Sequence, residues 1–233
     1  MRLSARVVLH GRVIGEPLEL LRDAVERTRV LTSGRSATGR SHDDADSVLG
    51  TIDTDGALGF DPFPLLSALH GAGVRAVVIG QVAGILHGSA ELTGDLDLLW
   101  DGVASRADDL AAAFGAVGGR LTDDDGAPLA LGAEAFLLPK VQFESAQASG
   151  DCCTVSLNWG QLPVQDFLGH ALTASDPDGF EVYYLRREDL ISMRRAVGRP
   201  KDLRRAAELE RLGGLTCSRA DVPRRASPSR CPG

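Results

Sequence analysis

The sequence has no long hydrophobic run and no recognisable export signal. None of its apolar stretches approaches the roughly 20 residues that a membrane-spanning helix needs. The first residues include Arg2 and Arg6 but lack the apolar core and small-residue cleavage pattern of a secretory signal. We therefore expect a cytoplasmic protein that has no membrane partner.

Cysteine pairs with zinc-binding spacing are also missing. The four cysteines are Cys152, Cys153, Cys217 and Cys231, and no two of them form a C-x-x-C pair. Structural zinc sites usually show such a pair. We expect these cysteines to be reduced thiols, as is usual in the cytoplasm.

Positive charge is in deficit. The chain has 25 Lys and Arg against 32 Asp and Glu, which gives a net charge of −7. Non-specific nucleic-acid binding requires a positive excess that neutralises phosphates, so strong non-specific DNA binding is not expected. A small phosphorylated ligand held by a few local cations remains compatible with this charge.

The commonest catalytic signatures are absent too. There is no Walker-type phosphate loop, no dinucleotide-binding glycine motif between a strand and a helix, and no H-E-x-x-H motif. No nucleophilic serine or cysteine motif is present. The chemistry of this chain must therefore be sought in other residues, above all its carboxylates.

Composition divides the 233 residues into one domain with two extensions. Residues 1–60 predict a poorly ordered N-terminal extension with one amphipathic helix over 17–31, followed by a polar Gly- and Ser-rich stretch. The ordered domain is expected over 61–212. Residues 213–233 turn to Arg, Ser and Pro and predict a disordered tail.

Within 61–212 the patterns predict an α+β fold, in which a small mixed β-sheet is flanked by helices. Helical spacing of apolar residues predicts the helices, and short β-branched or alternating runs predict the strands. The predicted helices are 62–70, a short one in VAGILHG, 105–117, 164–171, 187–197 and 200–212. The predicted strands are RAVVIG, DLDLLW, 133–138, 152–159 and 180–185.

Two carboxylates in DLDLLW form the strongest candidate site. Side chains alternate along a strand, so Asp95 and Asp97 point to one side while the leucines that follow them point into the core. Carboxylates this close repel each other unless a cation or protons lie between them, and Mg²⁺ accepts such ligands together with substrate phosphates. Upstream, Gly80 ends a strand where a helix begins, and free N–H groups at such a junction suit anions. Two acids on a solvent-exposed sheet face are the structural alternative.

The residues around this pair resemble a known family. Gly80, Ala83, Leu86-His87-Gly88-Ser89, Thr93 and Asp95-Leu96-Asp97 resemble the core of the minimal nucleotidyltransferase superfamily. The similarity is greatest to the bacterial group that includes nucleotidyltransferase-like toxins and antitoxins. Downstream, DLISMRRAVGRPKDLRRAAEL resembles the closing helices of that group, so the resemblance covers about residues 62–212.

The resemblance implies a polymerase beta-type palm core in which Asp95 and Asp97 are catalytic and bind Mg²⁺. The implied reaction moves a nucleoside monophosphate from an NTP to a hydroxyl of a protein or RNA acceptor, with a toxin–antitoxin partner as one candidate. The residues assigned to the nucleotide phosphates are Gly80, Gln81, Ser89, Arg194 and Lys201, with Arg199 as a further cation.

Three positions depart from the family pattern. Gln81 follows the turn glycine where many members have a small residue, and Glu91 lies where a basic residue is common. The third acid, which serves the family as base, is not evident, because the strand predicted over 152–159 has no acid in its interior. Ser156 or Pro163 takes that place, and Asp151 at the strand's edge is the nearest alternative.

These departures leave several hypotheses open. The first is a Mg²⁺-dependent nucleotidyltransferase. The second is a catalytically degenerate module that binds a nucleotide or a partner protein, and a third is a structural module whose acids bind nothing.

Two residues with ring side chains are further candidates for contact with a nucleotide. His87 precedes the loop, where it either contacts a phosphate or base or packs locally at the end of a helix. Trp159 either stacks on a nucleobase or fills the core as a strand tryptophan. The sequence leaves both pairs of alternatives open.

Overall fold

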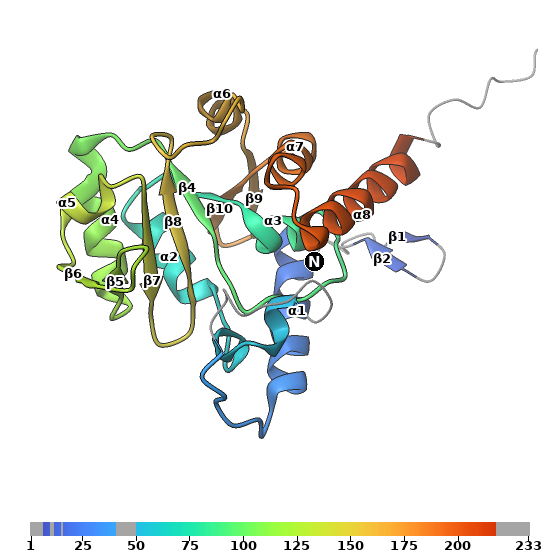
Figure 1. The fold of residues 1–233 in the computed structure, drawn as a ribbon. Helices are drawn as coiled ribbons and strands as arrows, with labels where there is room; N and C mark the ends of the chain where they lie inside the picture. Colours follow the sequence, from blue (N-terminus) through green and yellow to red (C-terminus); the bar gives the residue numbers. More distant parts are fainter. Residues whose placement is uncertain (1–6, 10–11, 15, 41–49, 218–233) are drawn as a thin grey trace, which may run out of the picture.

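The computed structural model describes residues 7–9, 12–14, 16–40 and 50–217 (Figure 1). These residues form a mixed α+β fold with one eight-stranded sheet and a separate two-stranded hairpin, β1 (Val7–Leu9) and β2 (Arg12–Ile14). The predicted fold class is confirmed at this level, although the sheet is larger than expected. In the part of the chain that the structure describes, no helix is both long and apolar enough to cross a membrane.

Helices that were predicted from apolar spacing are present, with shifts of a few residues at their ends. The last one continues beyond the predicted end at residue 212, and residues 218–233 lie outside the described part. The described α-helices are α1 Pro17–Thr32, α2 Phe63–Gly71, α3 Gly80–Leu86, α4 Ala104–Ala116, α5 Ala133–Phe136, α6 Val164–Gly169, α7 Arg187–Val197 and α8 Pro200–Cys217; two 3-10 turns are η2 Gly50–Asp53 and η3 Asp55–Ala57.

The eight-stranded sheet is mixed. Strands β4 and β8 pair in parallel, as do β3 and β10, and the other neighbours are antiparallel. In spatial order the strands are β6 Pro128–Leu129, β5 Arg120–Thr122, β7 Lys140–Glu144, β8 Ser149–Thr154, β4 Leu98–Trp100, β3 Val77–Val78, β10 Glu181–Tyr184 and β9 Leu172–Ser175.

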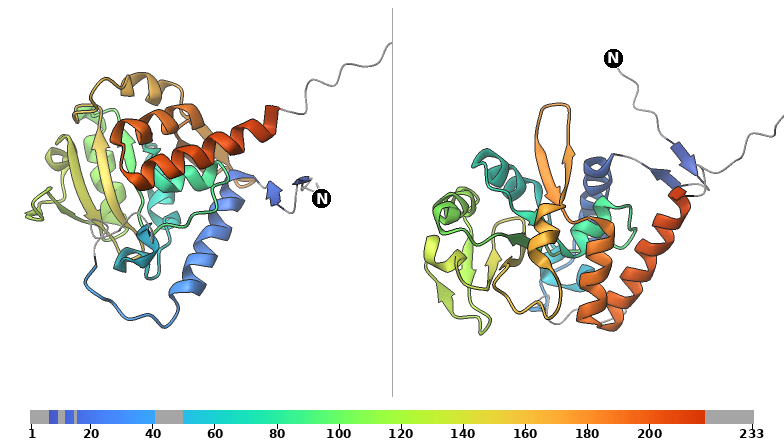
Figure 2. Two further views of the ribbon diagram at one scale, coloured as in Figure 1. Left: turned by 45° about the vertical axis from the view of Figure 1, so that its right-hand side comes forward. Right: turned by 90° about the horizontal axis from the view of Figure 1, so that it is seen from above.

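Helices cover the sheet from two sides. Seen from above, α7 and α8 lie on the opposite side of the sheet from α2 (Figure 2). Helices α2 and α4 pack against each other, α3 packs against α1 and α7, and α7 packs against α8. The central strands are buried between these layers: Val77, Leu98 and Leu99 are all fully buried. Burial of such side chains is the main source of stability for the sheet.

Helix α1 is part of the same core, although residues 1–60 were expected to form an extension. Leu18 and Leu21 lie on one helical face and are buried, and the helix packs against α3. An ion pair of 3.0 Å between Arg22 and Asp176 attaches the helix to the turn between β9 and β10. The predicted amphipathic helix is therefore confirmed and docks through its apolar face.

The prediction of a strand over residues 133–138 is wrong. This segment forms the short helix α5 after Gly132, because alanine and glutamate favour helix over strand. Its Phe136 is buried and lies 4.9 Å, between ring centroids, from Phe114 of α4. Packing between these two rings holds the helical turn against α4.

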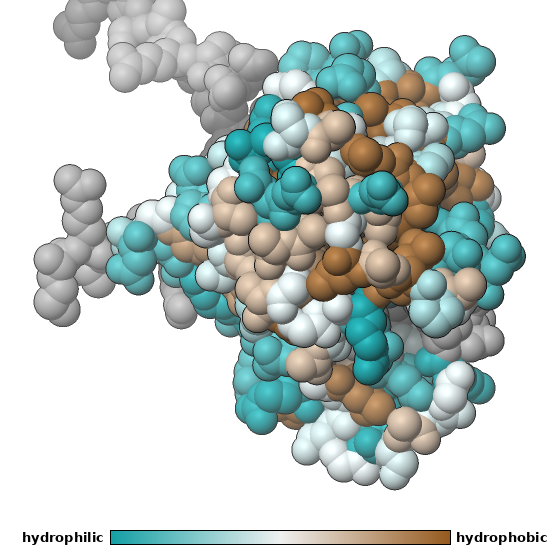
Figure 3. Space-filling model, turned by 90° about the vertical axis from the view of Figure 1, so that its left-hand side faces the viewer, coloured by the Kyte–Doolittle hydropathy of each residue, from teal (hydrophilic) through white to brown (hydrophobic). Residues whose placement is uncertain are grey.

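Apolar side chains gather on the face of the molecule that bears α5 (Figure 3). Three leucines next to this helix are exposed to a similar degree: Leu131 at 39%, Leu137 at 40% and Leu138 at 39%. None of them lines the candidate site described below. This face therefore takes no part in positioning the site.

Candidate functional site

A cavity of about 320 Å³ lies between the sheet and the closing helices α7 and α8. It is lined by the β3–α3 turn, the segment before β4, strands β7 and β8, one face of α7 and the start of α8. Six of the seven site residues predicted from the sequence line it: Gly80, Gln81, Asp95, Asp97, Arg194 and Lys201. The seventh, Ser89, does not.

The two predicted acids lie on the residues leading into β4. Asp95 and Asp97 are partly exposed, whereas Leu96 and Leu98 between and after them are fully buried. This is the alternation expected of an extended segment with one buried side. The pattern that singled out these carboxylates is therefore confirmed, and both line the cavity.

The neighbouring strand β8 carries a third acid, so the prediction that its interior lacks one is wrong. The strand spans Ser149–Thr154, which puts Asp151 inside it, whereas Ser156 and Pro163 lie beyond its end. The predicted strand over 152–159 therefore started three residues too late. A Cβ atom on Gly150 would lie 2.1 Å from the Leu96 carbonyl oxygen, so the glycine permits close approach of two strands.

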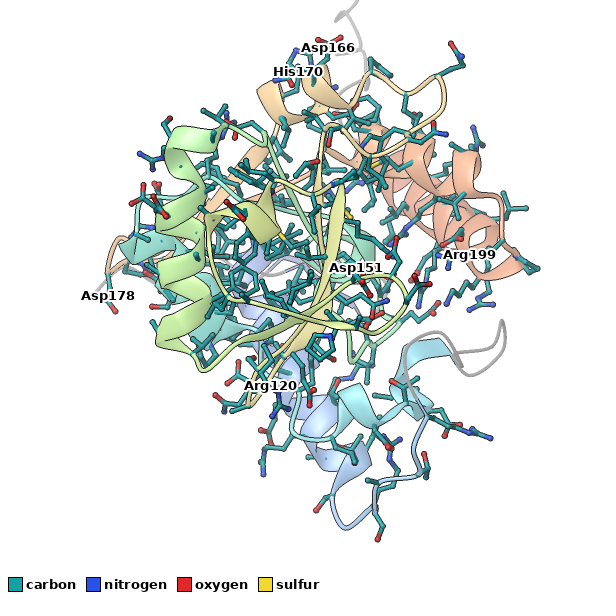
Figure 4. All side chains as sticks on the ribbon, turned by 60° about the vertical axis from the view of Figure 1, so that its left-hand side comes forward. Arg120, Asp151, Asp166, His170, Asp178 and Arg199 are labelled. Carbon is teal, nitrogen blue, oxygen red and sulfur yellow. The ribbon has the colours of Figure 1, made fainter. Side chains whose placement is uncertain are left out.

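The register of β8 against β4 places Asp151 beside the predicted pair. Asp95 is opposite Ser149 in a parallel bridge, so Asp97 is opposite Asp151. Opposite residues of neighbouring strands point to the same side of a sheet. All three carboxylates line the cavity, and Figure 4 shows Asp151 on the sheet with Arg199 across from it.

Gly80 lies in direct contact with one of these acids. Its φ of 62° belongs to the left-handed region that glycine adopts readily. A Cβ atom at this position would lie 1.9 Å from Oδ2 of Asp97, which no side chain could tolerate. The Ile79 N–H also donates to the Asp97 carbonyl, at 2.9 Å. Only glycine therefore lets the turn close over the Asp97 carboxylate.

Arg194 of α7 connects the closing helices to this turn. The side chain is 5% exposed, and its Nη2 donates to the Gly80 carbonyl at 3.0 Å and to Oε1 of Gln81 at 2.8 Å. Its Nη1 is also buried and has no hydrogen-bond acceptor among the described residues. Burial lowers the pKa of Arg194 to about 10, and the charge of Arg205 acts in the same direction. The group is still cationic at neutral pH.

Gln81 and Ser89 belong to a buried hydrogen-bond chain. The Gln81 Nε2 donates to Ser89 Oγ at 3.0 Å, and that hydroxyl donates to Oε2 of Glu208 on α8 at 2.6 Å. The structure therefore brings Gln81 to the wall of the cavity but leaves Ser89 behind it. Both side chains join the loop before the acids to α7 and α8.

The start of α8 supplies further charge. Arg199 pairs with Asp202, with Nε and Oδ2 2.6 Å apart. This hydrogen bond raises the pKa of Arg199, and Asp97 and Asp95 raise it further, so the guanidinium lies in the field of both acids. Burial lowers the pKa of Lys201, assisted by Arg199 and Arg205 and opposed by Asp202 and Asp95. Both cations line the cavity together with the predicted pair.

Two cations at the site could not be foreseen from the motif. Lys140 of β7 has its Nζ 3.8 Å from Oδ2 of Asp151 and 2.7 Å from Oδ1 of Asp124. Burial lowers the pKa of Lys140, but the bond to Asp124 and the charge of Asp151 outweigh it and leave the pKa above its ordinary value. Arg205 of α8 is held by Glu91, with Nε and Oε1 2.9 Å apart. Glu91 therefore orients a cation toward the cavity.

The donor set fits a hard divalent cation of the Mg²⁺ type. Such an ion needs only one or two protein carboxylates when substrate oxygens and waters complete its shell. Asp95 and Asp97 provide two, from alternate positions of one segment. No group of three or more His, Cys, Asp or Glu in the described ranges forms a ready-made metal cage. The residues therefore suit a metal that arrives with a phosphorylated substrate.

A larger cavity, of about 620 Å³, lies between residues 39–40 and 55–58 on one side and strands β5 and β7 on the other. The charges that line it have nearby partners: Arg40 pairs with Asp53, and Arg120 with Glu144. The Asp55 carboxylate accepts backbone N–H groups from the loop before it. The smaller cavity is the one in which the predicted carboxylates and several cations come together, so we take it as the candidate site.

No protein-family model matches this chain, and a search of curated proteins found no match. The resemblance noted from the sequence is therefore still a prediction. What supports a function is the arrangement of carboxylates and cations around the cavity.

Proposed function

We propose that the protein is a Mg²⁺-dependent nucleotidyltransferase that moves a nucleoside monophosphate from an NTP to a hydroxyl of a protein or RNA acceptor. One observation carries the proposal. Three carboxylates, two from the segment leading into β4 and one from β8, line one cavity beside Asp202, together with five cationic side chains from β7, α7, α8 and the residue before α8. These cations are Lys140, Arg194, Arg199, Lys201 and Arg205. Opposed carboxylates and cations suit a ligand that is a metal-bound polyphosphate.

Asp95 and Asp97 are the residues that would hold Mg²⁺. When bound, the ion would neutralise charge that grows on the α-phosphate and the leaving pyrophosphate. The cationic wall would bind the β- and γ-phosphates, and the unsatisfied Nη1 of Arg194 is a donor already oriented by its neighbours. Such preorganised donors are a major source of transition-state stabilisation.

Asp151 is the residue we assign as general base. In the proposed reaction the acceptor hydroxyl oxygen bonds to the α-phosphorus, and the bond from that phosphorus to the bridging oxygen of the β-phosphate breaks. The hydroxyl proton passes to a carboxylate oxygen of Asp151, and pyrophosphate leaves. A positioned base of this kind typically contributes about 10²–10⁴-fold in rate.

The order of elements supports a nucleotidyltransferase-type palm core. A glycine turn starts helix α3 directly after β3, and the two acids follow on the way into β4. The catalytically degenerate alternative depended on a missing third acid and on Gln81 after the turn glycine; Asp151 is now a candidate for that acid, and Gln81 accepts a hydrogen bond from Arg194. Whether the protein catalyses nucleotidyl transfer is therefore a question for the assay described below. The net charge of −7 favours a protein acceptor, including a toxin–antitoxin partner, over an unassisted RNA.

The test is label transfer from NTPs labelled at one chosen phosphate. Purified protein is incubated with Mg²⁺, a cell lysate as acceptor source, and each of the four NTPs labelled with ³²P at either the α- or the γ-position. Nucleotidyl transfer moves the α-label and not the γ-label onto the acceptor, whereas phosphoryl transfer does the reverse. Protease and ribonuclease treatment then tells a protein acceptor from RNA.

Matched variants make this assay decisive. The Asp95→Ala/Asp97→Ala double variant and chelation of Mg²⁺ should each abolish transfer. Asp108→Asn removes an exposed carboxylate on α4, away from the cavity, and should leave transfer unchanged. NTP binding without transfer of either label would refute the transferase and leave a nucleotide-binding module.

A further inference from the structure

Part of the wall of the candidate cavity is apolar, and none of the proposed phosphate chemistry uses it. This part of the wall is formed by Leu157, Trp159, Leu190, Met193 and Val197. The last three recur at helical spacing on one face of α7, the face that also carries Arg194. The same face of the helix therefore presents both a cation and apolar side chains to the cavity.

A hydrogen bond to the protein backbone fixes Trp159 at this apolar part of the wall. Its indole Nε1 donates to the carbonyl of Thr154, the last residue of β8, at 2.9 Å. The ring is only partly buried, so it still has surface to offer a ligand. A strand rises about 3.3 Å per residue, so Thr154 lies roughly 10 Å along β8 from Asp151. A nucleotide spans a separation of that order between its α-phosphate and its base.

We propose that this apolar part of the wall binds the nucleobase of the substrate by stacking on Trp159, without reading the base's hydrogen-bonding edge. The proposal rests on the proposed function for the phosphates, and it adds the class of nucleotide accepted. Polar side chains beside the ring lie outside the cavity lining: Asn158, whose Oδ1 accepts the Gly160 N–H at 3.1 Å, and Ser156 and Thr154, whose hydroxyls lie 2.6 Å apart. Stacking is tolerant of base identity because every base has a π-face.

Intrinsic fluorescence gives a direct readout, since the chain has two tryptophans and the other, Trp100, is 1% exposed. The full-length protein is titrated in Mg²⁺ with ATP, GTP, CTP, UTP and inorganic triphosphate. We expect the four nucleotides to quench the emission with affinities within about tenfold of one another, and triphosphate not to quench it. In Trp159→Phe the nucleotide-dependent quenching should disappear while nucleotides still bind.

Calorimetry of a second variant measures how much the Trp159 ring contributes to the affinity for ATP. Trp159→Leu keeps apolar volume but removes the stacking surface, so ATP should bind about tenfold more weakly while inorganic triphosphate binds as before. Phe180→Leu replaces a partly buried aromatic ring outside the cavity and should change neither affinity. Thermal unfolding of each variant identifies any general loss of structure.

The outcomes separate this inference from the proposed reaction. Unchanged ATP affinity in Trp159→Leu, or no quenching by any nucleotide, overturns the base site even if label transfer succeeds. Strong preference for one NTP overturns the non-selective stacking mode. Quenching that depends on Trp159 in a protein that transfers no label supports the base site and refutes the transferase.

Discussion

Substitution of Gly80 by alanine should damage stability and the candidate site together. The backbone φ of 62° is left-handed, and an alanine there costs about 1–2 kcal/mol. The added Cβ would also lie 1.9 Å from Oδ2 of Asp97, so that carboxylate must leave its position. A forced off-rotamer side chain costs a further 0.5–1.5 kcal/mol or so. We expect Gly80→Ala to lower the free energy of unfolding by about 2–3 kcal/mol.

A second glycine isolates the two contributions. Gly118 has a nearly identical φ of 68°, and a Cβ on it would meet nothing within 4 Å. Gly118→Ala should therefore cost the backbone strain alone, about 1–2 kcal/mol. In an Asp97→Ala background most of the extra cost of Gly80→Ala should vanish, because the carboxylate that it displaces is gone. That difference is a coupling energy of about 1 kcal/mol between the two positions.

Urea unfolding of the four variants and the wild type measures these values, and the label-transfer assay measures function. Gly80→Ala should reduce transfer as severely as loss of the Asp97 carboxylate does, whereas Gly118→Ala should leave it intact. Equal destabilisation by Gly80→Ala and Gly118→Ala, with transfer preserved in both, would refute the inferred contact between the turn and the acid.

Three further predictions concern other residues. Asp151→Asn should slow transfer about 10²–10⁴-fold in single-turnover assays with little change in NTP affinity, while Ser156→Ala should have no effect; the reverse pattern would move the base to Ser156. Arg194→Met leaves two acceptors at the glycine turn without their buried donor, so denaturant unfolding should show a loss of about 1–3 kcal/mol, and an unchanged midpoint would contradict the geometry. Burial lowers the pKa of His87 in the folded state and outweighs the effect of its bond to the Leu185 carbonyl. The unfolded chain therefore binds a proton more readily, so this contribution to stability is present above pH 6.5 or so and is lost as pH falls below it. The stability advantage of wild type over His87→Gln should accordingly shrink from pH 7 to pH 5, and a constant difference would exclude the effect.

Local patterns were sufficient to predict much of this fold. The α1 helix, the glycine turn at Gly80 and the alternation around Asp95 and Asp97 were all predicted, because each depends on neighbouring residues alone. Arg194 and Lys201 were assigned from the family resemblance, and both line the cavity. The misassigned strand over 133–138 was an error of local interpretation, because its alanines and glutamate favour helix; the contact of Phe136 with Phe114, which is tertiary, could not be read from the sequence.

Strand β7 was missed although its signal is present. Residues 140–144 alternate polar and apolar, and Val141 and Phe143 are 1% and 3% exposed while their neighbours are more open. A period of two over five residues predicts a half-buried strand. With β7 assigned, its antiparallel partner β8 would have been expected to start earlier, and Lys140 would have been placed near the site.

The ion pairs made by the loop that precedes Asp95 could not be predicted from local sequence patterns. Glu91 lies where the resembling family often has a basic residue, and from the sequence alone it weakens the assignment. In the structure it binds Arg204 and Arg205 of α8. The positive charge at this place is thus supplied from another helix, and the sequence contains no local signal that joins the two segments.

The third acid depends on strand register. Side chains alternate with a period of two, so a slip of one residue between β8 and β4 would turn Asp151 into the core and remove it from the cavity. Two features oppose such a slip. Gly150 is the residue that can lie against the Leu96 carbonyl, and Cys152, on the same side of the strand, is 1% exposed in the core. Since both features are packing relations between distant segments, no motif in the sequence could have paired Asp151 with Asp97. Replacing Gly150 by valine should therefore disturb the site more than it disturbs the helices that cover it.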